Sequence, residues 1–435
     1  MSTHGTGAAR LWRDRPFVTY WTGQTLSQVG DRVSELALPL LAITMLGASA
    51  TEVGALTAAI WAPNLLALFI GTWVDRRPSK RRLLVIANAV QCVAVASIPA
   101  AYFLRHLTIS HLFIAAVVLG GGGVLYQTAY PTFFVRLVPQ DQYVQANSLL
   151  STTRSASFIA GPPLAGLLIQ TLTAPVALIV DAASFVSSGL LIHAIHADEP
   201  TPQLQGGHQE PFRRRVGLGV RYLAGHPYLR ASLACSTTLN FFSFVVQAVI
   251  VLYASRDLHL GAAAIGVAFG IGALGGLLGA AVAGPAARLV GAGKLIATGA
   301  VLFCLPFALL PLAHGTPTAK ISLLAAAEFI SAFGIMLFDI NNNAVQTAVT
   351  ANNMRSRVSG AYATVNYGIR PIGALAGGLA AQHFGPPVTI TTAAIAGALA
   401  FLWLLGTPVI AVRSIAGLQP WPDQHPDTAA TTQTR

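Results

Sequence analysis

The sequence predicts an all-α membrane protein with twelve transmembrane helices in two six-helix bundles and with both termini in the cytoplasm. Three observations lead to this fold class. Of the 435 residues, 54% are hydrophobic and only 9% are charged, whereas a soluble protein carries about 25% charged residues. The apolar residues form long runs that each reach the roughly 20 residues needed to cross a bilayer. A polar segment near the middle of the chain separates six runs from six.

Helices are the expected spanning elements, because the runs lack the short alternating pattern of barrel strands and a helix satisfies its own backbone polar groups in lipid. In the first half we expect spans at 16–46, 51–73, 83–104, 111–134, 148–171 and 174–196. In the second half we expect them at 230–254, 261–284, 294–313, 321–345, 358–383 and 386–410. The first run is too long and too charged for a cleaved signal peptide, so we expect it to be retained.

These spans predict five segments along the chain. They are a cytoplasmic N-terminus (1–15), an N-terminal bundle (16–196), a cytoplasmic central loop (197–229), a C-terminal bundle (230–410) and a cytoplasmic tail (411–435). The tail is rich in Pro, Thr and Gln, a composition that predicts disorder.

The distribution of basic residues predicts the orientation. With the N-terminus inside, the inner loops and tails hold twenty of the 26 Arg and Lys residues, and the outer loops hold Arg105, Arg256 and Lys320. The other three basic residues lie inside predicted spans. An excess of basic residues marks the cytoplasmic side. The same positions explain the net charge of +11 without a nucleic-acid partner.

The two halves of the chain echo each other. Segment 71–76 (Gly-Thr-Trp-Val-Asp-Arg) has a weaker counterpart at 284–288, and segment 161–166 (Gly-Pro-Pro-Leu-Ala-Gly) has one at 370–373. Repeated halves are the architecture of transporters in which one bundle rocks against the other.

The segment between the second and third spans resembles the loop motif of the major facilitator superfamily. Gly71, Asp75 and Arg76 match this motif and precede the basic cluster 80–82, although Pro-Ser at 78–79 replaces the usual Gly and basic residue. A carboxylate at this helix end can accept from an arginine or a helix N-terminus across the two halves, which gives Asp75 a locking role. The alternative reading is ordinary topogenic charge.

The fifth span resembles the motif that antiporters of this superfamily carry there. Gly161, Pro162 and Gly166 match it, whereas Ala165 replaces one Gly. Gly residues let neighbouring helices pack closely and Pro kinks the helix, so we expect a conformational role.

Three further segments are similar to the drug:proton antiporter branch that contains macrolide and siderophore exporters. They are 27–31 (Ser-Gln-Val-Gly-Asp), 181–185 (Asp-Ala-Ala-Ser-Phe) and 219–227, and the resemblance covers roughly residues 10–410. It implies a proton-driven efflux pump with its substrate in a central cavity formed by the first, fourth, seventh and tenth helices.

Charged residues inside the first span are candidates for proton coupling. Asp31 lies near the middle of the span, and Glu35 follows one turn later on the same face. A charge in mid-membrane costs about 2.5–3.5 kcal/mol even on the lenient insertion scale, so intramembrane carboxylates are functional candidates. The alternative is that Arg32 neutralises Glu35 and the cluster only fixes helix packing.

The span 321–345 carries two further carboxylates. Glu328 and Asp339 lie eleven residues apart, about three turns, and therefore on similar faces. Arg370, in the span 358–383, needs a carboxylate partner, and Asp339 is our candidate. A pair that breaks when Asp339 is protonated would couple proton binding to rearrangement, although a permanent structural pair fits the sequence equally well.

Aromatic and amide side chains on spaced helix faces are typical of a cavity for bulky, partly apolar molecules. The candidates are Gln24, Gln28, Tyr126, Gln127, Tyr130, Asn240, Phe241, Phe244, Gln247 and Asn342. For any single residue, packing against lipid or a neighbouring helix is an equally good account.

These features predict a secondary active transporter of the bacterial inner membrane that works as a monomer by alternating access. The expected activity is proton-coupled efflux of a drug, antibiotic or secondary metabolite. The alternatives are an importer of a small metabolite on the same fold, or a lipid or lysolipid flippase. We expect no enzyme activity, cofactor or metal site, because no nucleotide-binding motif, Ser-His arrangement or metal-ligand spacing is present.

Overall fold

The computed structural model describes residues 11–12, 14–195, 212–352 and 354–418, and every regular element in these ranges is a helix. Most of the predicted N-terminal segment, residues 196–211 of the predicted central loop and residues 419–435 of the predicted tail lie outside the described residues.

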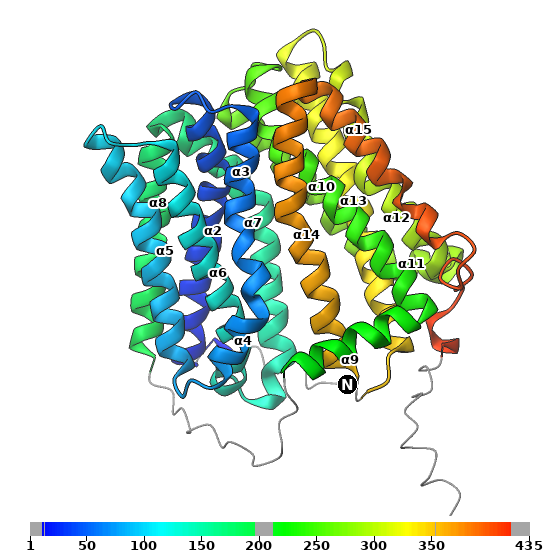
Figure 1. The fold of residues 1–435 in the computed structure, drawn as a ribbon. Helices are drawn as coiled ribbons and strands as arrows, with labels where there is room; N and C mark the ends of the chain where they lie inside the picture. Colours follow the sequence, from blue (N-terminus) through cyan, green and yellow to red (C-terminus); the bar gives the residue numbers. More distant parts are fainter. Residues whose placement is uncertain (1–10, 13, 196–211, 353, 419–435) are drawn as a thin grey trace, which may run out of the picture.

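The chain forms its first group of helices between residues 15 and 194 (Figure 1). They are α2 (Arg15–Thr44), α3 (Ala50–Trp61), η1 (Ala62–Leu66), α4 (Ala67–Asp75), α5 (Lys80–Phe103), α6 (Ile109–Leu137), η2 (Gln140–Gln142), α7 (Tyr143–Leu172) and α8 (Ala174–Ala194).

The second group follows α9 (Phe212–Gly225). It comprises α10 (Pro227–Arg256), α11 (Ala262–Val290), α12 (Ala292–Cys304), η3 (Leu305–Leu312), α13 (Pro317–Val349), α14 (Arg355–Phe384), α15 (Pro386–Ala398), η4 (Leu399–Leu404) and the short η5 (Ile415–Gly417).

Local sequence explains where several helices begin and end. Ser49 and Glu52 form a reciprocal capping box at the start of α3, with the Ser49 backbone nitrogen donating to Glu52 Oε2 at 2.7 Å. The Thr108 hydroxyl accepts from the His111 backbone nitrogen and caps the start of α6. The α14–α15 junction is Gly385, whose φ of +81° is a left-handed conformation that glycine adopts without strain.

Each predicted span coincides with a helix, and two differences stand out. The segment 197–229 was predicted to be a loop, but it contains the helix α9. The last span was expected to continue to residue 410, but its helix ends at Leu404, because Leu405 is extended and Gly406 has a φ of +71°.

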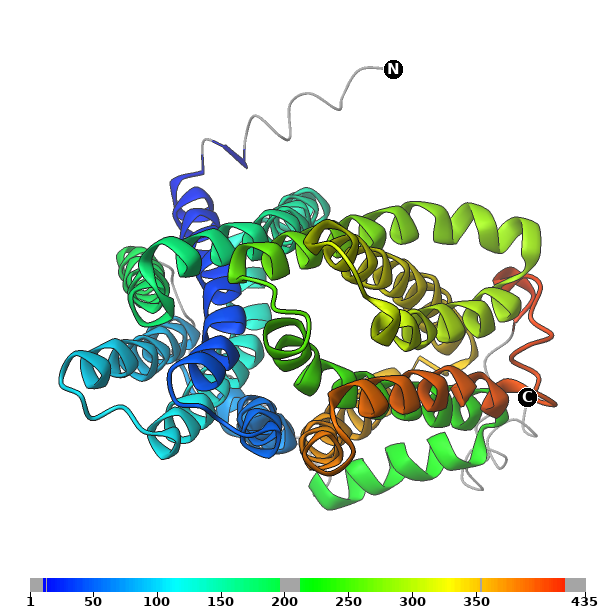
Figure 2. The ribbon, with the colours of Figure 1, turned by 90° about the horizontal axis from the view of Figure 1, so that it is seen from above.

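The helices form two groups that lie side by side, as the view along their axes shows (Figure 2). In the first group α2 packs on α7 and α8, and α5 packs on α6 and α8. In the second group α10 packs on α14 and α15, and α13 packs on α11 and α12. We call these groups the N-half and the C-half. The halves meet mainly through α7 with α11 and α3 with α14.

Close contacts between the halves occur at the end of the molecule where α2 finishes. We call this the far end, and the end where α2 begins the near end. At the far end a Cβ added to Gly54 would lie 2.7 Å from Gly378 Cα, and one added to Gly166 would lie 2.4 Å from the Ala262 carbonyl oxygen. Glycine at both positions therefore allows backbone to approach backbone between the halves.

Two polar side chains also cross between the halves at the far end. The Arg256 Nη2 atom donates to the carbonyl oxygens of Ile43 at 3.3 Å and Ala48 at 2.8 Å, at the C-terminal end of α2. In the opposite direction, the Ala263 backbone nitrogen donates to Gln170 Oε1 at 3.1 Å, at the start of α11. Each half thus satisfies unpaired backbone groups at a helix end of the other half.

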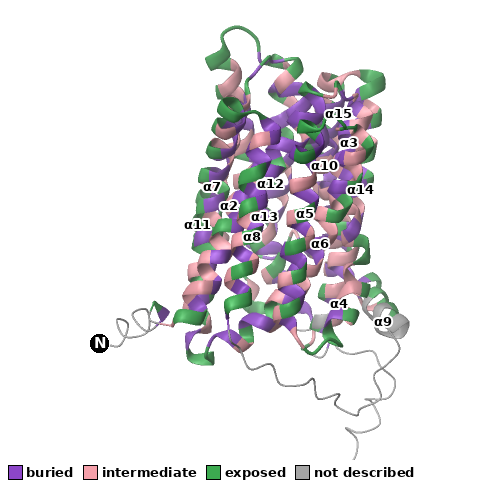
Figure 3. Cartoon of the chain, turned by 90° about the vertical axis from the view of Figure 1, so that its left-hand side faces the viewer, coloured by how far each residue is buried: buried purple, intermediate pink, exposed green. Residues whose placement is uncertain are grey.

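The outer surface of the bundle is apolar. Large exposed apolar side chains include Val93 of α5, Leu190 of α8 and Leu402 of η4. Exposed residues recur along the length of the helices (Figure 3). Within the described ranges, ten helices are long and apolar enough to cross a membrane. The chain is therefore a multi-pass membrane protein, since an apolar surface of this extent needs lipid as its solvent.

Candidate functional site

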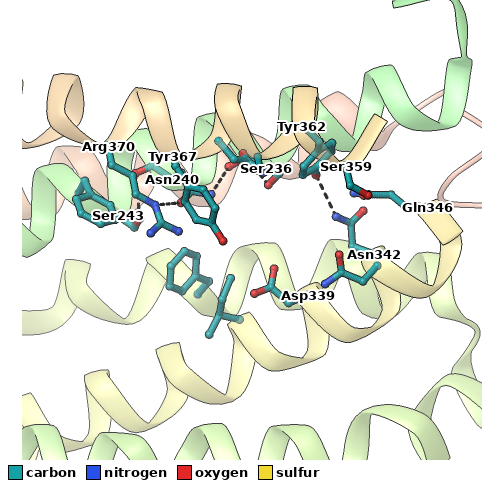
Figure 4. A pocket seen from close by; sticks show the side chains of 16 residues that line it. Ser236, Asn240, Ser243, Asp339, Asn342, Gln346, Ser359, Tyr362, Tyr367 and Arg370 are labelled. Atoms are coloured by element: carbon teal, nitrogen blue, oxygen red, sulfur yellow. Dashed lines mark hydrogen bonds between the residues drawn. The ribbon is translucent and has the colours of Figure 1, made fainter. Parts of the chain in front are cut away.

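A polar cavity lies in the C-half between α10, α13 and α14 (Figure 4). Its volume is about 340 Å³. The lining residues are Ser236, Asn240, Ser243, Phe244, Phe303, Ile335, Asp339, Asn342, Asn343, Gln346, Ser359, Tyr362, Ala363, Asn366, Tyr367 and Arg370. Of the predicted site residues, the cavity thus brings together Asp339, Arg370, Asn240, Phe244 and Asn342.

Arg370 is held by an amide and three aromatic rings. Its Nε donates to Asn240 Oδ1 at 2.9 Å (Figure 4). Its guanidinium carbon lies 4.3 Å from the ring centroid of Tyr367, 4.7 Å from Trp61 and 5.0 Å from Phe244. Such distances are those of cation–π contacts. Trp61 belongs to the N-half, so Arg370 is also a contact between the halves.

Asp339 faces the same cavity as Arg370 but does not pair with it. In the described part of the chain, neither side chain has an ion pair within 4.0 Å. The predicted pairing is therefore absent from this structure, in which Asn240 accepts from Arg370 Nε and three rings pack against the guanidinium.

A network of hydrogen bonds joins three helices at one end of this cavity. The Ser232 hydroxyl donates to Asn342 Oδ1, and Asn342 Nδ2 donates to the Tyr362 hydroxyl at 3.1 Å. Gln346 Nε2 donates to Ser232 Oγ at 3.2 Å. Asn342 was predicted to contact substrate, but its amide is buried and bonded within the protein on both sides. Its role here is to connect α13 with α10 and α14.

A second cavity of about 270 Å³ lies in the N-half and is more apolar. The lining residues are Asp31, Arg32, Ser34, Glu35, Leu38, Ile60, Trp61, Asn64, Gln91, Leu119, Gly120, Gly123, Val124 and Gln127. Asp31 and Glu35, the two carboxylates predicted in the first span, therefore line the same space.

Within this cavity the two carboxylates differ in their partners. Glu35 accepts from Arg32 Nη1 at 2.5 Å, and its side chain is 60% exposed. The Arg32 guanidinium also lies 4.1 Å from the ring centroid of Phe158 and packs against Gly161 of α7. In the part of the chain that the structure describes, the Asp31 carboxylate has no hydrogen bond or ion pair. Of the two carboxylates, only Asp31 thus lacks a partner among the described residues.

Asp181 of α8 lies behind this cavity and has a structural role. It is fully buried, and it accepts hydrogen bonds from the hydroxyls of Ser34 and Ser184. Gly30 of α2 gives it room, since a Cβ there would lie 2.4 Å from Asp181 Oδ1. The buried carboxylate joins α2 to α8.

A third cavity of about 170 Å³ lies nearer to the near end of the N-half. It contains all five predicted N-half contact residues, namely Gln24, Gln28, Tyr126, Gln127 and Tyr130. The Tyr126 hydroxyl donates to Gln24 Oε1 at 2.5 Å. Gln127 lines both N-half cavities. The three cavities therefore form a series along the interface between the halves.

Trp61 joins the N-half cavity to the C-half cavity, and the sequence analysis did not single it out. It lines the N-half cavity, and its ring packs edge-on against Phe244 with a centroid distance of 5.1 Å. It stands where α3 changes into the 3-10 helix η1, just before Pro63. A Trp followed by Ala-Pro inside an apolar run is a signal of a helix break, and a mid-helix 3-10 segment often marks a hinge.

Three other predicted residues lie outside these cavities. Phe241 packs against Phe242, with ring centroids 5.0 Å apart, and Gln247 is exposed. Both belong to α10 and are not among the lining residues of the three cavities, although Gln247, seven residues after Asn240, lies on the same side of the helix as Asn240. Glu328 faces Gly272 of α11 rather than the C-half cavity, since a Cβ at Gly272 would lie 2.6 Å from Glu328 Cβ. Phe241 and Gln247 thus fit the packing and surface alternatives.

The loop motif lies at the near end. Asp75 and Arg76 are exposed, and the Asp75 carboxylate has no hydrogen bond or ion pair with any described residue. The buried Lys80 instead donates to the carbonyl oxygens of Val74 at 2.6 Å and Arg77 at 2.7 Å, which caps α4. Gly71 packs on Thr128 of α6.

The motif of the fifth span lies at the interface between the halves. A Cβ added to Gly266 of α11 would lie 2.2 Å from the Pro162 carbonyl oxygen, and Gly166 packs against Ala262. Gly161 contacts Arg32 within the N-half instead. Pro162 and Gly166 therefore hold α7 against α11, whereas Gly161 makes room for the arginine.

Comparison with known proteins agrees with this architecture. A family model described as transmembrane secretion effector matches residues 7–434. The multidrug efflux pump Tap of Mycobacterium tuberculosis is 24% identical over 359 residues, which cover 81% of this chain and 84% of Tap. Macrolide efflux protein A of Streptococcus pyogenes is 21% identical over 272 residues, 60% of this chain and 65% of that protein.

Solved structures share the fold. The nucleoside transporter NupG superposes with a TM-score of 0.72 at 14% identity, over 90% of this chain and 99% of that one. A bacterial homologue of the iron transporter ferroportin, in an inward-facing state, gives 0.68 at 17% identity, over 90% and 99% of the two chains. From its helices, its cavities and the family match along almost its whole length, the chain belongs to the transmembrane secretion effector family of the major facilitator superfamily, a family of membrane transporters.

Proposed function

We propose that this chain is a proton-coupled exporter of small, partly apolar molecules in the bacterial inner membrane. One observation carries the proposal. Three cavities follow the interface between the halves, and two of them expose a carboxylate without a partner among the described residues, Asp31 in one and Asp339 in the other. An unpaired charge in the membrane interior is costly and marks an ion or substrate pathway.

Asp31 is our first candidate for the proton-binding residue. Its neighbour Glu35 lines the same cavity but is paired with Arg32, whereas the Asp31 carboxylate has no hydrogen bond or ion pair among the described residues. A carboxylate in a medium of low polarity binds a proton more readily than one in water, so it can take a proton on one side and release it when its surroundings change. Asp339 is the second candidate, and Glu328, with its side chain against α11, is the third.

The twelve spans comprise the ten apolar helices together with α2 and α14, which are more polar because they carry the charges of the two cavities. Each is 30 residues long and packs between spanning helices of its half. We assign residues 16–196 and 230–410 to the two bundles. The near end, with its excess of basic residues, faces the cytoplasm, and both termini lie there.

The direction of transport rests on the relatives. The names of Tap, of macrolide efflux protein A and of a putative sugar efflux transporter of Deinococcus radiodurans all specify efflux. The close contacts at the far end support a cytoplasm-facing state, in which an exporter loads its substrate. We propose that Asp75 locks the near end in the opposite state; its carboxylate has no hydrogen bond or ion pair with a described residue here, which agrees with that role.

The test is dye uptake into inverted membrane vesicles driven by a proton gradient. Uptake should occur in wild-type vesicles and stop when a protonophore is added. Asp31→Asn should reduce uptake about ten-fold or more, which corresponds to a loss of about 1.4 kcal/mol. The control is Asp141→Asn, which removes an exposed carboxylate in η2 and should have no effect. Uptake that the protonophore leaves unchanged would contradict proton coupling.

A further inference from the structure

Arg370 has the geometry of a receptor rather than of one half of an ion pair. Its Nε–H is used by Asn240, and Asn240 is itself fixed because its Nδ2 donates to the Ser236 carbonyl oxygen at 2.9 Å. Aromatic rings at 4.3–5.0 Å from the guanidinium carbon restrain the group further. These contacts fix where the guanidinium lies and in which direction its edge points.

The other edge of the guanidinium is not used by the protein. Arginine has five N–H donors, of which four belong to the two Nη atoms. Among the described residues these atoms have no hydrogen-bond acceptor and no carboxylate within 4.0 Å. They are also absent from the buried unsatisfied atoms, so they reach open space in the cavity. A positive charge held in this manner stabilises an anion that enters the cavity.

We propose that Arg370 is the substrate-recognition residue of this transporter and that it binds an oxyanion, above all a carboxylate, on a partly apolar molecule. The two Nη groups match the two oxygens of a carboxylate in a parallel, bidentate arrangement. This inference rests on the proposed function as a small-molecule transporter. It assigns to Arg370 a role in binding, where the sequence had suggested a role in proton coupling.

The surroundings of Arg370 fit a ligand of this chemistry. The cavity of about 340 Å³ is lined largely by neutral amide and hydroxyl groups, which can bond polar atoms close to the carboxylate. Trp61 opens onto the more apolar N-half cavity of about 270 Å³, which suits the apolar body of the molecule. An organic cation fits less well, because the guanidinium already fills the aromatic cage that would hold it.

Trp61 makes this site depend on the conformation of the transporter. It is the one ring of the three that the N-half contributes, and it stands at the break between α3 and η1. When the halves rock apart at this level, the ring withdraws and water replaces it around the guanidinium. An ion pair in water is weaker than one shielded from it. Trp61 is therefore a positioning residue that strengthens binding in the cytoplasm-facing state and weakens it after rearrangement.

The test uses the full chain in lipid nanodiscs and three fluorescent ligands of one shape. They are 9-anthracenecarboxylate, neutral 9-anthracenemethanol and cationic 9-anthracenemethylammonium, and fluorescence anisotropy gives each Kd. The wild type should bind the carboxylate at least about ten-fold more tightly than the alcohol. Arg370→Gln should remove this preference while the Kd of the alcohol stays constant, and Arg370→Lys should restore part of it.

Two further variants sharpen the assignment. Arg154→Gln removes an exposed cation that lines the third cavity and has no cation–π contact among the described residues, and it should keep the preference. Trp61→Leu should weaken carboxylate binding several-fold and alcohol binding less, a difference that mere loss of packing would not produce. Octanoate and oleoyl lysophosphatidate are then tested as competitors of 9-anthracenecarboxylate. Competition by octanoate at the lower concentration indicates a soluble oxyanion, and competition by the lysophosphatidate at the lower concentration indicates an oxyanion of lipid origin.

The inference is overturned if the ammonium ligand binds best, if Arg370→Gln keeps the preference for the carboxylate, or if Arg154→Gln removes it. The binding assay contains no proton gradient, so its result is independent of the proposed coupling. A preference that depends on Arg370 in a protein without proton-driven transport would refute only the proposed function. Proton-driven transport without any preference would refute only this inference.

Discussion

The N-half and C-half cavities hold the same types of charged group in opposite arrangements. In the N-half the cation Arg32 is bound by Glu35 and by the ring of Phe158, and the carboxylate Asp31 has no partner among the described residues. In the C-half the cation Arg370 keeps four N–H donors for which the described part of the chain offers no acceptor, and none of its carboxylates lies within 4.0 Å. Two halves with echoing sequences can thus present a proton acceptor on one side and an anion receptor on the other.

This contrast suggests a division of labour, in which the N-half binds the proton and the C-half binds the substrate. The two cavities touch at Trp61, which lines the N-half cavity and covers Arg370 of the C-half. A change of charge at Asp31 and a change of occupancy at Arg370 can then influence each other through one aromatic ring and the helix break beside it.

The largest expected effects come from separating the two functions. Asp31→Asn should reduce proton-driven uptake about ten-fold or more, which corresponds to a loss of about 1.4 kcal/mol. The same variant should leave the Kd of 9-anthracenecarboxylate within about two-fold of the wild-type value. Arg370→Gln should instead raise the Kd of 9-anthracenecarboxylate about ten-fold or more in the same binding assay. If both variants lose binding to the same extent, the division of labour between the halves is wrong.

A slightly smaller effect is expected from forcing the halves apart at their glycine contact. Gly266→Leu introduces a side chain where even a Cβ would lie 2.2 Å from the Pro162 carbonyl oxygen. Overpacking typically costs about 1–3 kcal/mol, which should favour the state in which α7 and α11 separate. The measurement is the labelling rate, by a membrane-impermeant thiol reagent, of a cysteine introduced at Ala263, a half-buried residue of α11 beside Gly166.

The matched control for this experiment lies on the same helix. A Cβ at Gly284 would meet nothing within 4 Å, so Gly284→Leu should leave the labelling rate unchanged. An equal increase in both variants would mean that added bulk on α11, rather than its contact with α7, moves the halves.

The polar contacts at the far end should have a more moderate effect. Arg256→Gln removes two hydrogen bonds from a charged donor to the end of α2, and such bonds contribute about 1.5–3 kcal/mol each at most. We expect a several-fold increase in the accessibility of the far end, measured by the same thiol labelling. Arg105→Gln, a change in the loop between α5 and α6 at the far end of the N-half, is the control. No difference between the two variants would remove Arg256 from the closing contact.

The fold was predictable because it depends on the length and polarity of each run. Every predicted span became a helix, since about 20 apolar residues in lipid have no other way to satisfy their backbone. The helix α9 was missed because its basic residues are also typical of a loop. The last span was predicted too long because residues 405–410 are apolar, although Gly406 ends the helix there.

The candidate site was only partly predictable, because sequence gives the spacing on one helix but not the rotation of its neighbours. The spacing placed Asp31 and Glu35 correctly on one face. It could not predict that Arg370 would donate a hydrogen bond to Asn240, on another helix, instead of pairing with Asp339. Trp61 was missed for the same reason, since its partners Phe244 and Arg370 belong to the other half of the chain.

The smallest expected effect tests whether the polar network of the C-half is structural. Tyr362→Phe removes the hydroxyl that accepts from Asn342 Nδ2 at 3.1 Å and leaves this buried donor without its acceptor. Loss of such a bond costs about 1–3 kcal/mol, so the Tm of the purified protein should fall by a few degrees. Tyr367→Phe is the control, because it keeps the ring beside Arg370 and removes a hydroxyl without a partner among the described residues. If Tyr362→Phe instead changes the Kd of 9-anthracenecarboxylate at constant Tm, the network belongs to the substrate site, and the C-half binds its ligand over a wider surface than Arg370 alone.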